Sequence, residues 1–195
     1  DARIIVEYKQ LGVDRYAHMA IAPYPTHLVS HWQLADGTDI TIRPVRPEDG
    51  ELDQKFIRGL SDKSRYFRFM GAMHELPETL LASLTQIDYG REMAFIAITR
   101  DKDQEIALGV ARYSINPDGN SCNFALAVAD YVAGKRLGRK LMTSLMEAAR
   151  EQGLKEIEGI VLNNNHRMLG LMNRLGFTIK PVEDNHGLMK VSKQL

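Results

Sequence analysis

The stretch of the sequence with the clearest potential for chemistry is a basic, glycine-containing segment, Ala133-Gly134-Lys135-Arg136-Leu137-Gly138-Arg139-Lys140. It holds four cations within six residues, and a long helical pattern begins inside it. The first turn of a helix carries about half a positive elementary charge, so cations there are unfavourable unless an anion compensates them. Glycine lets backbone N–H groups approach a ligand closely, and phosphates bind at helix starts for these combined reasons. The segment therefore predicts an anion-binding loop, with a solvated basic turn as the alternative.

The residues before this loop predict a β-strand that leaves room on one face. Their side chains alternate between two sets, Phe124, Leu126 and Val128 on one face and Ala125, Ala127 and Ala129 on the other. The small side chains permit a ligand or a closely packed helix on their face. A Walker loop is excluded, because that motif ends in Gly-Lys-Ser or Gly-Lys-Thr and Gly138 is followed by Arg139.

The elements that must position this loop are read from hydrophobic periodicity. Alternating or short apolar runs predict strands at 38–43, 93–99, 106–115, 123–129, 157–162, 177–179 and 188–191. Apolar residues at helical spacing predict helices from 48, over 64–69, from 77, over a segment that ends near 152, and from 164 or 165 to 175. The longest helix is expected to bury Leu137, Leu141, Leu145 and Ala148.

This order of elements indicates a mixed α/β (α+β) fold, in which a central mixed sheet is flanked by helices on both faces. The strand–helix–strand unit between residues 123 and 162 requires two parallel strands, because its helix crosses from one end of the sheet to the other.

The composition excludes several classes of protein. In 195 residues, 25 Lys and Arg balance 25 Asp and Glu, so the formal net charge is zero. Nucleic-acid-binding and membrane-surface domains rely on an excess of cations, so neither kind of partner is expected. The one cysteine, Cys122, forms no internal disulfide, which favours a reducing compartment and hence the cytoplasm. No apolar run approaches the roughly 20 residues that span a bilayer.

Two segments resemble the GNAT superfamily of acyl-CoA-dependent N-acetyltransferases. The pyrophosphate loop of that family has the pattern Gln/Arg-x-x-Gly-x-Gly/Ala, and residues 133–138 depart from it at the first and fourth positions. Residues 165–177, where an Asn precedes a helix that ends in Leu-Gly-Phe, are similar to the closing segment of the family. The resemblance covers about residues 38–195. It implies a splayed sheet and acetyl-CoA as the acyl donor, attacked directly by an amine in a ternary complex.

The resemblance also implies which residues hold acetyl-CoA. Its pyrophosphate is expected over the loop, and its pantetheine along the strand before the loop. The residues expected to contact acetyl-CoA are Leu126, Ala127, Val128, Ala133, Gly134, Lys135, Arg136, Leu137, Gly138, Arg139 and Asn165. No metal is expected: His27 and His31 have the spacing of a helical metal pair, but Pro23 and Pro25 disfavour a helix there.

Finer similarities point to one branch of this superfamily. Residues 61–69 and 87–94 resemble the bacterial protein lysine acetyltransferases of the Pat type, in which a GNAT domain is fused to an acyl-CoA synthetase-like region. Residues 1–25 are similar to the end of the ATP-grasp part of that region. The expected organisation is therefore an ATP-grasp tail plus linker over residues 1–37 and a GNAT acetyltransferase domain over residues 38–195. The implied acceptor is a lysine of a protein, such as an acyl-CoA synthetase.

The catalytic residues depart from the family pattern. Alignment along the strand places Asn123 where the Pat-type family has a glutamate as general base, and an amide is a poor proton acceptor. Met172 falls where many GNAT enzymes have a tyrosine as general acid, and it has no proton to donate. Glu92 and Asp130 are candidate replacements for the base, and exposed charges at strand ends are the alternative interpretation of both. Cys122 is expected to be a buried strand residue rather than a nucleophile.

Three functions are consistent with these residues. The first is transfer of an acetyl group from acetyl-CoA to a lysine amine of a protein. The second is acetylation of a small amine. The third is a catalytically silent module that senses acyl-CoA and regulates a partner, and Asn123 keeps this alternative open. The sequence leaves the oligomeric state open as well.

Overall fold

The computed structural model describes residues 22–71, 73–102, 104–183 and 185–195, and these form eight strands of one sheet. The strands are β1 (Ser30–Gln33), β2 (Asp39–Pro44), β3 (Glu92–Asp101), β4 (Gln104–Ile115), β5 (Ser121–Val128), β6 (Glu156–Leu162), β7 (Thr178–Val182) and β8 (Asn185–Gln194). Their order across the sheet is β1-β2-β3-β4-β5-β6-β8-β7. β5 and β6 are parallel and every other neighbouring pair is antiparallel, which confirms the expected mixed sheet and its parallel pair.

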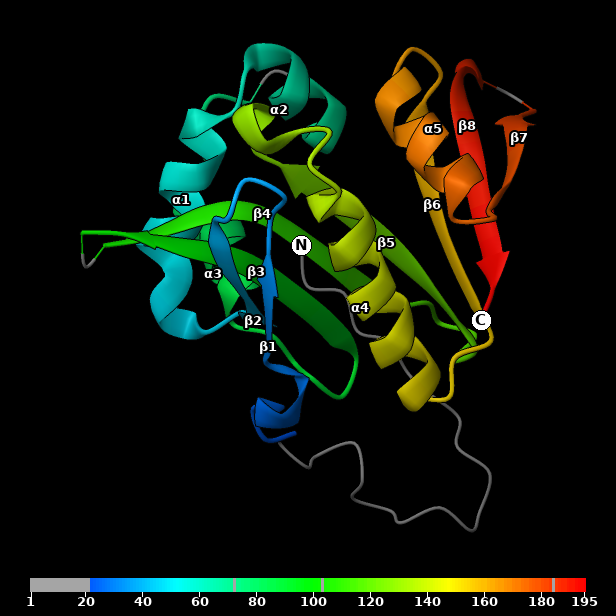
Figure 1. Cartoon of the computed structure of the whole chain (residues 1–195). Coiled ribbons are helices and arrows are strands. Elements are labelled where there is room, and N and C mark those ends of the chain that lie inside the picture. The colour runs from blue at the N-terminus through cyan, green and yellow to red at the C-terminus, as the bar shows by residue number, and fades with distance from the viewer. Residues whose placement is uncertain (1–21, 72, 103, 184) are drawn as a thin grey trace, which may run out of the picture.

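Helices cover both faces of this sheet (Figure 1). Within the described ranges the α-helices are α1 (Gly50–Gly59), α2 (Asp62–Phe69), α3 (Glu78–Thr85), α4 (Leu137–Glu151) and α5 (His166–Arg174), and the short 3-10 helices are η2 (Thr26–Leu28), η3 (Pro47–Asp49) and η4 (Asp130–Val132). On β4, a Cβ added to Gly109 would lie 2.9 Å from Leu141 of α4, whereas Arg112 donates a hydrogen bond to the Leu84 carbonyl of α3. Gly109 and Arg112 are three residues apart and face opposite ways, so α4 and α3 lie on opposite faces.

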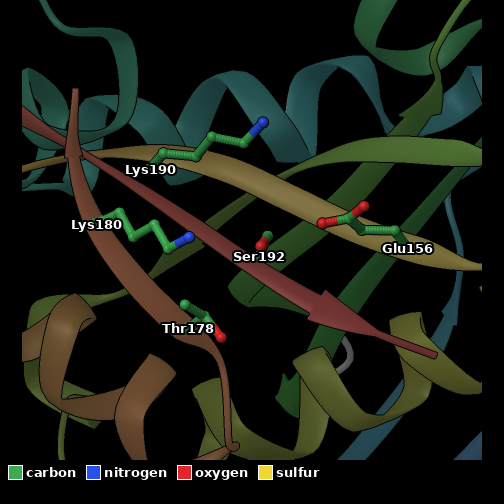
Figure 2. A pocket seen from close by; sticks show the side chains of 5 residues that line it. All are labelled: Glu156, Thr178, Lys180, Lys190 and Ser192. Carbon is green, nitrogen blue, oxygen red and sulfur yellow. The ribbon is translucent and has the colours of Figure 1, made fainter. Parts of the chain in front are cut away.

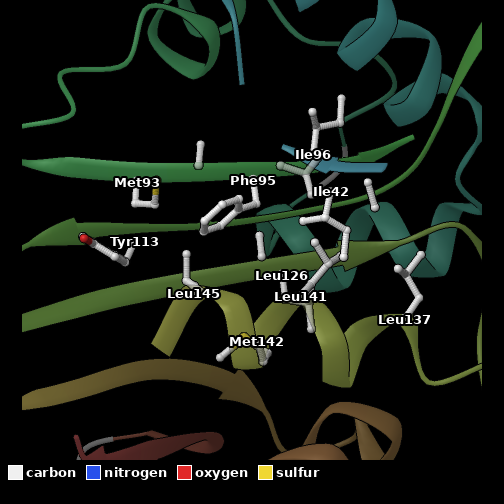
Figure 3. Close-up of a cluster of buried hydrophobic side chains, with 14 of the residues drawn as sticks. Ile42, Met93, Phe95, Ile96, Tyr113, Leu126, Leu137, Leu141, Met142 and Leu145 are labelled. Carbon is white, nitrogen blue, oxygen red and sulfur yellow. The ribbon is translucent and has the colours of Figure 1, made fainter. Parts of the chain in front are cut away.

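α4 buries the apolar stripe that its sequence predicts. Leu137, Leu141, Leu145 and Ala148 are all at most 4% exposed, and their spacing places them on one side of the helix. Figure 3 shows the leucines in one cluster with side chains of the strands. Burying one aliphatic side chain contributes about 1.5–3 kcal/mol, so the stripe fixes α4, and the loop at its N-terminus, on the sheet.

The sequence does not predict β1. Its four residues alternate between half-buried and exposed, and so short a segment carries little signal of its own. Leu34, 3% exposed, and a turn with Gly37 at φ +87° bring it back antiparallel to β2. Part of the expected linker therefore joins the sheet. Residues 1–21, where most of the similarity to the synthetase-like region lies, are outside the described residues, and the domain boundary at residue 37 remains a prediction.

β5 and β6 separate after a short stretch of pairing. Their paired residues are Ser121 with Glu156, Cys122 with Ile157, and Asn123 with Glu158. Beyond this fork the two ribbons diverge (Figure 1). Phe124 lies at the fork: its ring meets that of Phe177 edge to face at 5.7 Å between centroids, and a Cβ added to Gly159 would lie 2.8 Å from it. The ring occupies space that closer pairing would need, and the expected splayed sheet is confirmed.

Candidate functional site

The loop between β5 and α4 turns sharply at two residues with left-handed backbone. Gly134 has φ +87° and Arg136 has φ +67°, while the half-buried Ala133 ends η4 in an extended conformation. Glycine adopts a left-handed conformation at little cost, whereas for arginine it costs roughly 1 kcal/mol or more. Arg136 is also the N-cap of α4. Non-glycine residues held in this conformation cluster at functional sites, because the surrounding structure must impose it.

Within the described part of the chain, no side chain caps the start of α4. In α5, by contrast, the Asn165 side chain accepts the N–H of Met168 at 3.2 Å, so Asn165 begins α5 as predicted. The first N–H groups of a helix have no acceptor inside the helix. Those of Leu137, Gly138 and Arg139 are therefore donors at the positive end of the α4 dipole. Such an array of donors suits a phosphate group.

Two predicted loop residues are fixed by packing. Leu137 is 1% exposed, so only its backbone is accessible to a ligand. A Cβ added to Gly138 would lie 3.4 Å from Leu171 of α5 and 3.6 Å from both Leu126 and Val128 of β5. Leu137 and Gly138 therefore hold the loop against the sheet and against α5.

The cations of the loop differ in what they contact. Lys135 forms an ion pair, with Nζ 2.7 Å from Oδ2 of Asp36 in the turn between β1 and β2. The hydrogen bond from Lys135 lowers the pKa of Asp36 well below its usual range, so the Asp36 carboxylate is charged at neutral pH. Arg136 and Arg139 are exposed and have no ion-pair partner in the described ranges. These two arginines, more than Lys135, are available to a bound anion.

β5 presents an unpaired edge beside the loop. Over residues 124–128 it pairs with β4 alone, since β6 has separated from it. Among the described strands, backbone groups of β5 that point toward β6 therefore lack a partner, and an extended ligand with amide groups can pair with them. Leu126 and Val128 turn their side chains toward Gly138, and Ala127 lies on the other face.

A row of polar side chains crosses the face of the sheet opposite α4. The strand register pairs Glu92 with Ser114, Ser114 with Asn123, and Asn123 with Glu158. Paired residues of neighbouring strands point to the same side, so all four lie on one face. Ser114 is two residues from Arg112, which contacts α3, so this face is the one turned away from α4.

Glu92 has surroundings that suit a proton acceptor. Burial raises the pKa of Glu92, the positive charge of Arg112 opposes that rise, and Asp88 adds to it. A general base works best when its pKa lies near the operating pH. One strand, β4, lies between Glu92 and Asn123, so they are two strand spacings or roughly 10 Å apart, and a bridging molecule is needed to connect them.

Asn123 is exposed and belongs to a hydrogen-bonded chain. Its Nδ2 donates to Oδ1 of Asn116 at 2.6 Å, and Nδ2 of Asn116 donates to Ser121 Oγ at 2.7 Å and to Glu158 Oε1 at 3.1 Å. Glu158 Oε2 lies 2.5 Å from Nζ of Lys190 on β8. Neither Asn116 nor Glu158 is predicted as a site residue from the sequence. Asn116 reaches Asn123 through the hairpin between β4 and β5, and Glu158 reaches it through the long-range register of β5 and β6.

Three other candidates are engaged or buried. Burial raises the pKa of Asp130, but hydrogen bonds from the Ser61 N–H and the Ser64 hydroxyl, at 2.8 and 2.7 Å, outweigh it and lower the pKa overall. Met172 is fully buried. Cys122 is fully buried as well, and burial raises its pKa to about 12, which confirms a core residue and not a reactive thiolate.

The described residues contain no group of three His, Cys, Asp or Glu side chains placed to hold a metal ion. His27 lies in η2 and His31 on β1, so the two do not share a helix face. None of the described helices has the length and apolar character needed to cross a membrane.

An open hollow of about 330 Å³ lies on the same face as Asn123, over the last three strands of the sheet. Figure 2 shows the side chains that line it, Glu156, Thr178, Lys180, Lys190 and Ser192. Lys180 and Lys190 are directly paired in the register of β7 and β8. Like charges placed opposite each other are unfavourable, but Glu158 already pairs with Lys190 and Glu156 lines the same hollow. Lys180 is therefore the cation of the hollow that has no ion-pair partner among the described residues.

Known proteins resemble this chain in sequence and fold. The model of the Acetyltransferase (GNAT) family matches residues 60–177. The chain is 36% identical to Acetyltransferase PA5475 of Pseudomonas aeruginosa over 149 residues, 75% of this chain and 80% of that protein. It is 28% identical to Acetyltransferase Pat of Mycolicibacterium smegmatis over 74% of this chain, and it spans 43% of that longer protein. The solved GNAT domain of S. lividans PAT has a TM-score of 0.80 at 24% identity, with 89% of this chain and 100% of that one covered.

The matched range contains the parts of the chain that the sequence predicts to hold the donor. It includes β5, the basic loop, α4, β6 and α5, and therefore both the fork and the uncapped helix start. Acetyl-CoA is the donor in this family. The chain thus belongs to the GNAT family of acetyltransferases, with acetyl-CoA as its acyl donor.

Proposed function

We propose that this chain transfers the acetyl group of acetyl-CoA to the ε-amine of a lysine in a protein. The observation that carries the protein acceptor is the open half of the sheet face that bears Asn123. α1 and α3 lie against this face at β4, but α5 lies against the other face, where Lys193 donates to the Leu175 carbonyl at 2.6 Å. On the Asn123 side of β6, the apolar side chain of Ile160 is 42% exposed, so this half of the face is open and a lysine presented by a large partner can reach the fork.

The donor would occupy the opposite side of the fork. Backbone N–H groups of residues 137–139, with Arg136 and Arg139 beside them, fit the pyrophosphate. The unpaired edge of β5 over residues 124–128 fits the amide groups of pantetheine, which would pair with it as an added strand does. Both parts meet where β5 and β6 separate, so the thioester would lie beside Asn123.

The reaction needs a neutral amine. The nitrogen attacks the thioester carbon, an N–C bond forms, the C–S bond breaks, and CoA leaves as its thiol. A lysine has an unperturbed pKa near 10.4, so only about one amine in 10³ to 10⁴ is neutral at pH 7, a penalty of roughly 4–5 kcal/mol. Glu92 is half-buried and lies on the sheet face that bears Asn123, which we call the acceptor face. It is the proposed proton acceptor, through a bridging molecule.

The segments that resemble Pat-type enzymes border the acceptor face. α2 lies within residues 61–69, and residues 87–94 lead into β3 and include Glu92. Arg65 donates to the Leu60 carbonyl and pairs with Asp62, and burial lowers the pKa of Arg68 to about 10. Arg65 is therefore engaged by its own helix and Arg68 is withdrawn from solvent, which leaves the exposed Arg91 as the side chain of this region suited to acidic groups around a target lysine.

The proposed partner is an acyl-CoA synthetase acting in the cytoplasm. The resemblance to Pat-type enzymes and the names of two similar proteins, Acetyltransferase Pat and the GNAT domain of S. lividans PAT, support this choice. Lys180, in the hollow, would pair with an acidic side chain of the partner close to its target lysine.

A thiol-release assay with acetyl-CoA and a panel of synthetases, lysine peptides and small amines tests the proposal. We expect CoA release with a synthetase, and acetyl-lysine on that protein by mass spectrometry. The charge reversal Arg91→Glu should reduce turnover of the protein acceptor and leave acetyl-CoA affinity intact. If polyamines or amino acids turn over while no protein is modified, the chain is a small-amine acetyltransferase.

Asn123 specifically favours the alternative of a silent acyl-CoA sensor, because it occupies the position of the expected base. The same assay separates this function from the others: acetyl-CoA would bind in calorimetry, but no acceptor in the panel would release CoA above the rate of spontaneous hydrolysis.

A further inference from the structure

We propose that Asn123 orients the acceptor amine through its carbonyl oxygen, and that Glu158, Asn116 and Ser121 set this orientation as positioning residues. The proposal rests on the acetyl transfer proposed above. It assigns to Asn123 a role that a glutamate base would not have, because the amide accepts an N–H and takes up no proton. Around Asn123, a set of hydrogen bonds has donors and acceptors that can be assigned one after another.

The first constraint comes from Glu158. Its Oε2 is held by the Lys190 ammonium, which can only donate, at 2.5 Å. Its Oε1 lies 3.1 Å from the Asn116 amide nitrogen. A carboxylate can only accept, so Asn116 must turn its NH₂ group toward Glu158. An amide flip of Asn116 would place two acceptors against each other.

The second constraint reaches Asn116 independently, from Asp118. The Ser121 hydroxyl donates to Oδ2 of Asp118 at 2.8 Å. Backbone hydrogen bonds from Asn120 and Ser121 lower the pKa of Asp118, which keeps this carboxylate ionised as an acceptor. The Ser121 oxygen is then left to accept from Asn116 Nδ2 at 2.7 Å. Two carboxylates on different elements therefore fix Asn116 in the same orientation.

Asn116 in turn fixes Asn123. With its NH₂ group committed to Ser121 and Glu158, Asn116 presents Oδ1 to Asn123, whose Nδ2 donates at 2.6 Å. The Asn123 carbonyl oxygen is therefore the end of the amide that does not face Asn116. The residue is exposed and stands at the last paired position before the fork, on the acceptor face. An amine that is to be acetylated at this position can therefore donate an N–H to the Asn123 carbonyl oxygen.

This orientation has a chemical consequence. A neutral amine that donates one N–H to the Asn123 oxygen keeps its lone pair for the thioester carbon. Its nitrogen then loses a proton as the amide forms, and the departing CoA thiolate takes one up, so the products are the amide and CoA thiol. Asn123 thus helps to align the amine and does not lower its pKa.

The experiment compares Glu158→Gln and Asn116→Ala with the control Glu147→Gln, an exposed glutamate on α4. In ¹⁵N-labelled protein, Glu158→Gln should shift the Asn123 side-chain amide signals, assigned from an Asn123→Ala spectrum, and the control should not. With a lysine peptide as acceptor, Glu158→Gln and Asn116→Ala should each raise the KM for the amine about 3- to 10-fold, the value of one hydrogen bond. The acetyl-CoA Kd should stay constant.

A double-mutant cycle separates positioning from general destabilisation. If Glu158 acts through Asn123, Glu158→Gln should have no further effect on the amine KM in an Asn123→Ala background. A full effect in that background, or Asn123 amide signals that do not respond to Glu158→Gln, would overturn the proposal. The amide signals are measured without turnover, so they test the orientation of Asn123 even if the protein is inactive. Failure of acetyl transfer in every assay would therefore count against the proposed function alone.

Discussion

Asn123 of β5 and Glu158 of β6 are the last two residues that pair before these strands separate. One carries an amide exposed on the acceptor face, and the other a carboxylate already paired with Lys190. The Glu158 carboxylate, at the fork, is thus already engaged in structural contacts. The proton of the attacking amine must therefore be accepted by Glu92, two strands away, or by the solvent.

The first prediction concerns the pH dependence of turnover. Lysine has a pKa near 10.4, so without a strong base at position 123 the rate should rise with the fraction of neutral amine. We expect turnover to climb about tenfold per pH unit from pH 7 toward pH 9. Asn123→Glu supplies a carboxylate at the fork and should increase turnover at pH 7 by at least about 10-fold. Initial rates of CoA release at several pH values measure both effects.

Glu92→Gln is the companion variant to this pH series. Since burial raises the pKa of Glu92, removing this carboxylate should flatten the pH–rate profile at its low-pH end. If Asn123→Glu leaves turnover at pH 7 unchanged while Glu92→Gln abolishes it, Glu92 is the sole base and the assignment of position 123 is wrong.

A second prediction concerns Gly138. Its Cβ position is 3.4–3.6 Å from three side chains of β5 and α5, so alanine fits, but the branched Val side chain would push α4 away from them. Overpacking of this kind costs about 1–3 kcal/mol. We expect Gly138→Val to weaken acetyl-CoA binding at least about 10-fold in calorimetry, because the N–H groups of the loop move with the helix. Gly138→Ala is the control, and an unchanged affinity in Gly138→Val would refute the loop assignment.

The third prediction ranks the cations of the loop. Arg136→Ala and Arg139→Ala should each weaken acetyl-CoA binding about 2- to 5-fold at low salt, because each removes one exposed, flexible charge. Lys135→Ala should have a smaller effect, since Lys135 is already paired with Asp36. The differences should shrink as ionic strength rises. If Lys135→Ala weakens acetyl-CoA binding more than either arginine variant, Lys135 leaves Asp36 to contact the phosphate.

Cys122 provides a fourth prediction. Because burial raises its pKa to about 12, the thiol should react with iodoacetamide at pH 8 only when the protein unfolds. Cys122→Ser should keep turnover within about twofold and lower the stability by about 1–3 kcal/mol, because a hydroxyl replaces a buried sulfur. Mass spectrometry after timed alkylation measures the first effect. An acetyl-thioester trapped on Cys122 would contradict direct attack on acetyl-CoA.

The fifth prediction compares two ion pairs. Arg43 and Asp49 are buried together, with Nη1 and Oδ2 2.6 Å apart, whereas Arg58 and Glu75 are 2.7 Å apart on the surface. Asp49→Ala leaves the buried Arg43 guanidinium with only the partly exposed Glu105, whose Oε2 lies 3.2 Å from Nη2, so the variant should cost about 3–5 kcal/mol in urea unfolding. Glu75→Ala should cost at most about 1 kcal/mol. Equal losses would mean that the buried pair contributes no more than a surface one.

Local patterns made much of the fold predictable. The stripe of Leu137, Leu141 and Leu145 specifies α4, and the alternation along residues 123–129 specifies β5, because both signals lie within one element. The basic loop is predictable as well, since its position at the start of a helix can be read directly from the sequence.

The rest depends on contacts between distant segments. Glu158 lies 35 residues from Asn123 in the sequence and reaches it only through the register of two parallel strands. Lys135 has the same appearance in the sequence as Arg136, and only the turn that follows β1 shows that it has a partner in Asp36. Four residues of β1 are too few to carry a period of their own.

The outer strands of the described sheet, β1 and β7, affect whether copies of the protein associate at high concentration. An unpaired strand edge is a template on which a second chain can add a strand. β1 offers only four residues for this, and β7 carries Pro181, which has no N–H, at the point where its register shifts. A proline and an irregular register both disfavour further pairing. Neither of these outer strands therefore favours edge-to-edge joining of copies of the chain, even at high concentration.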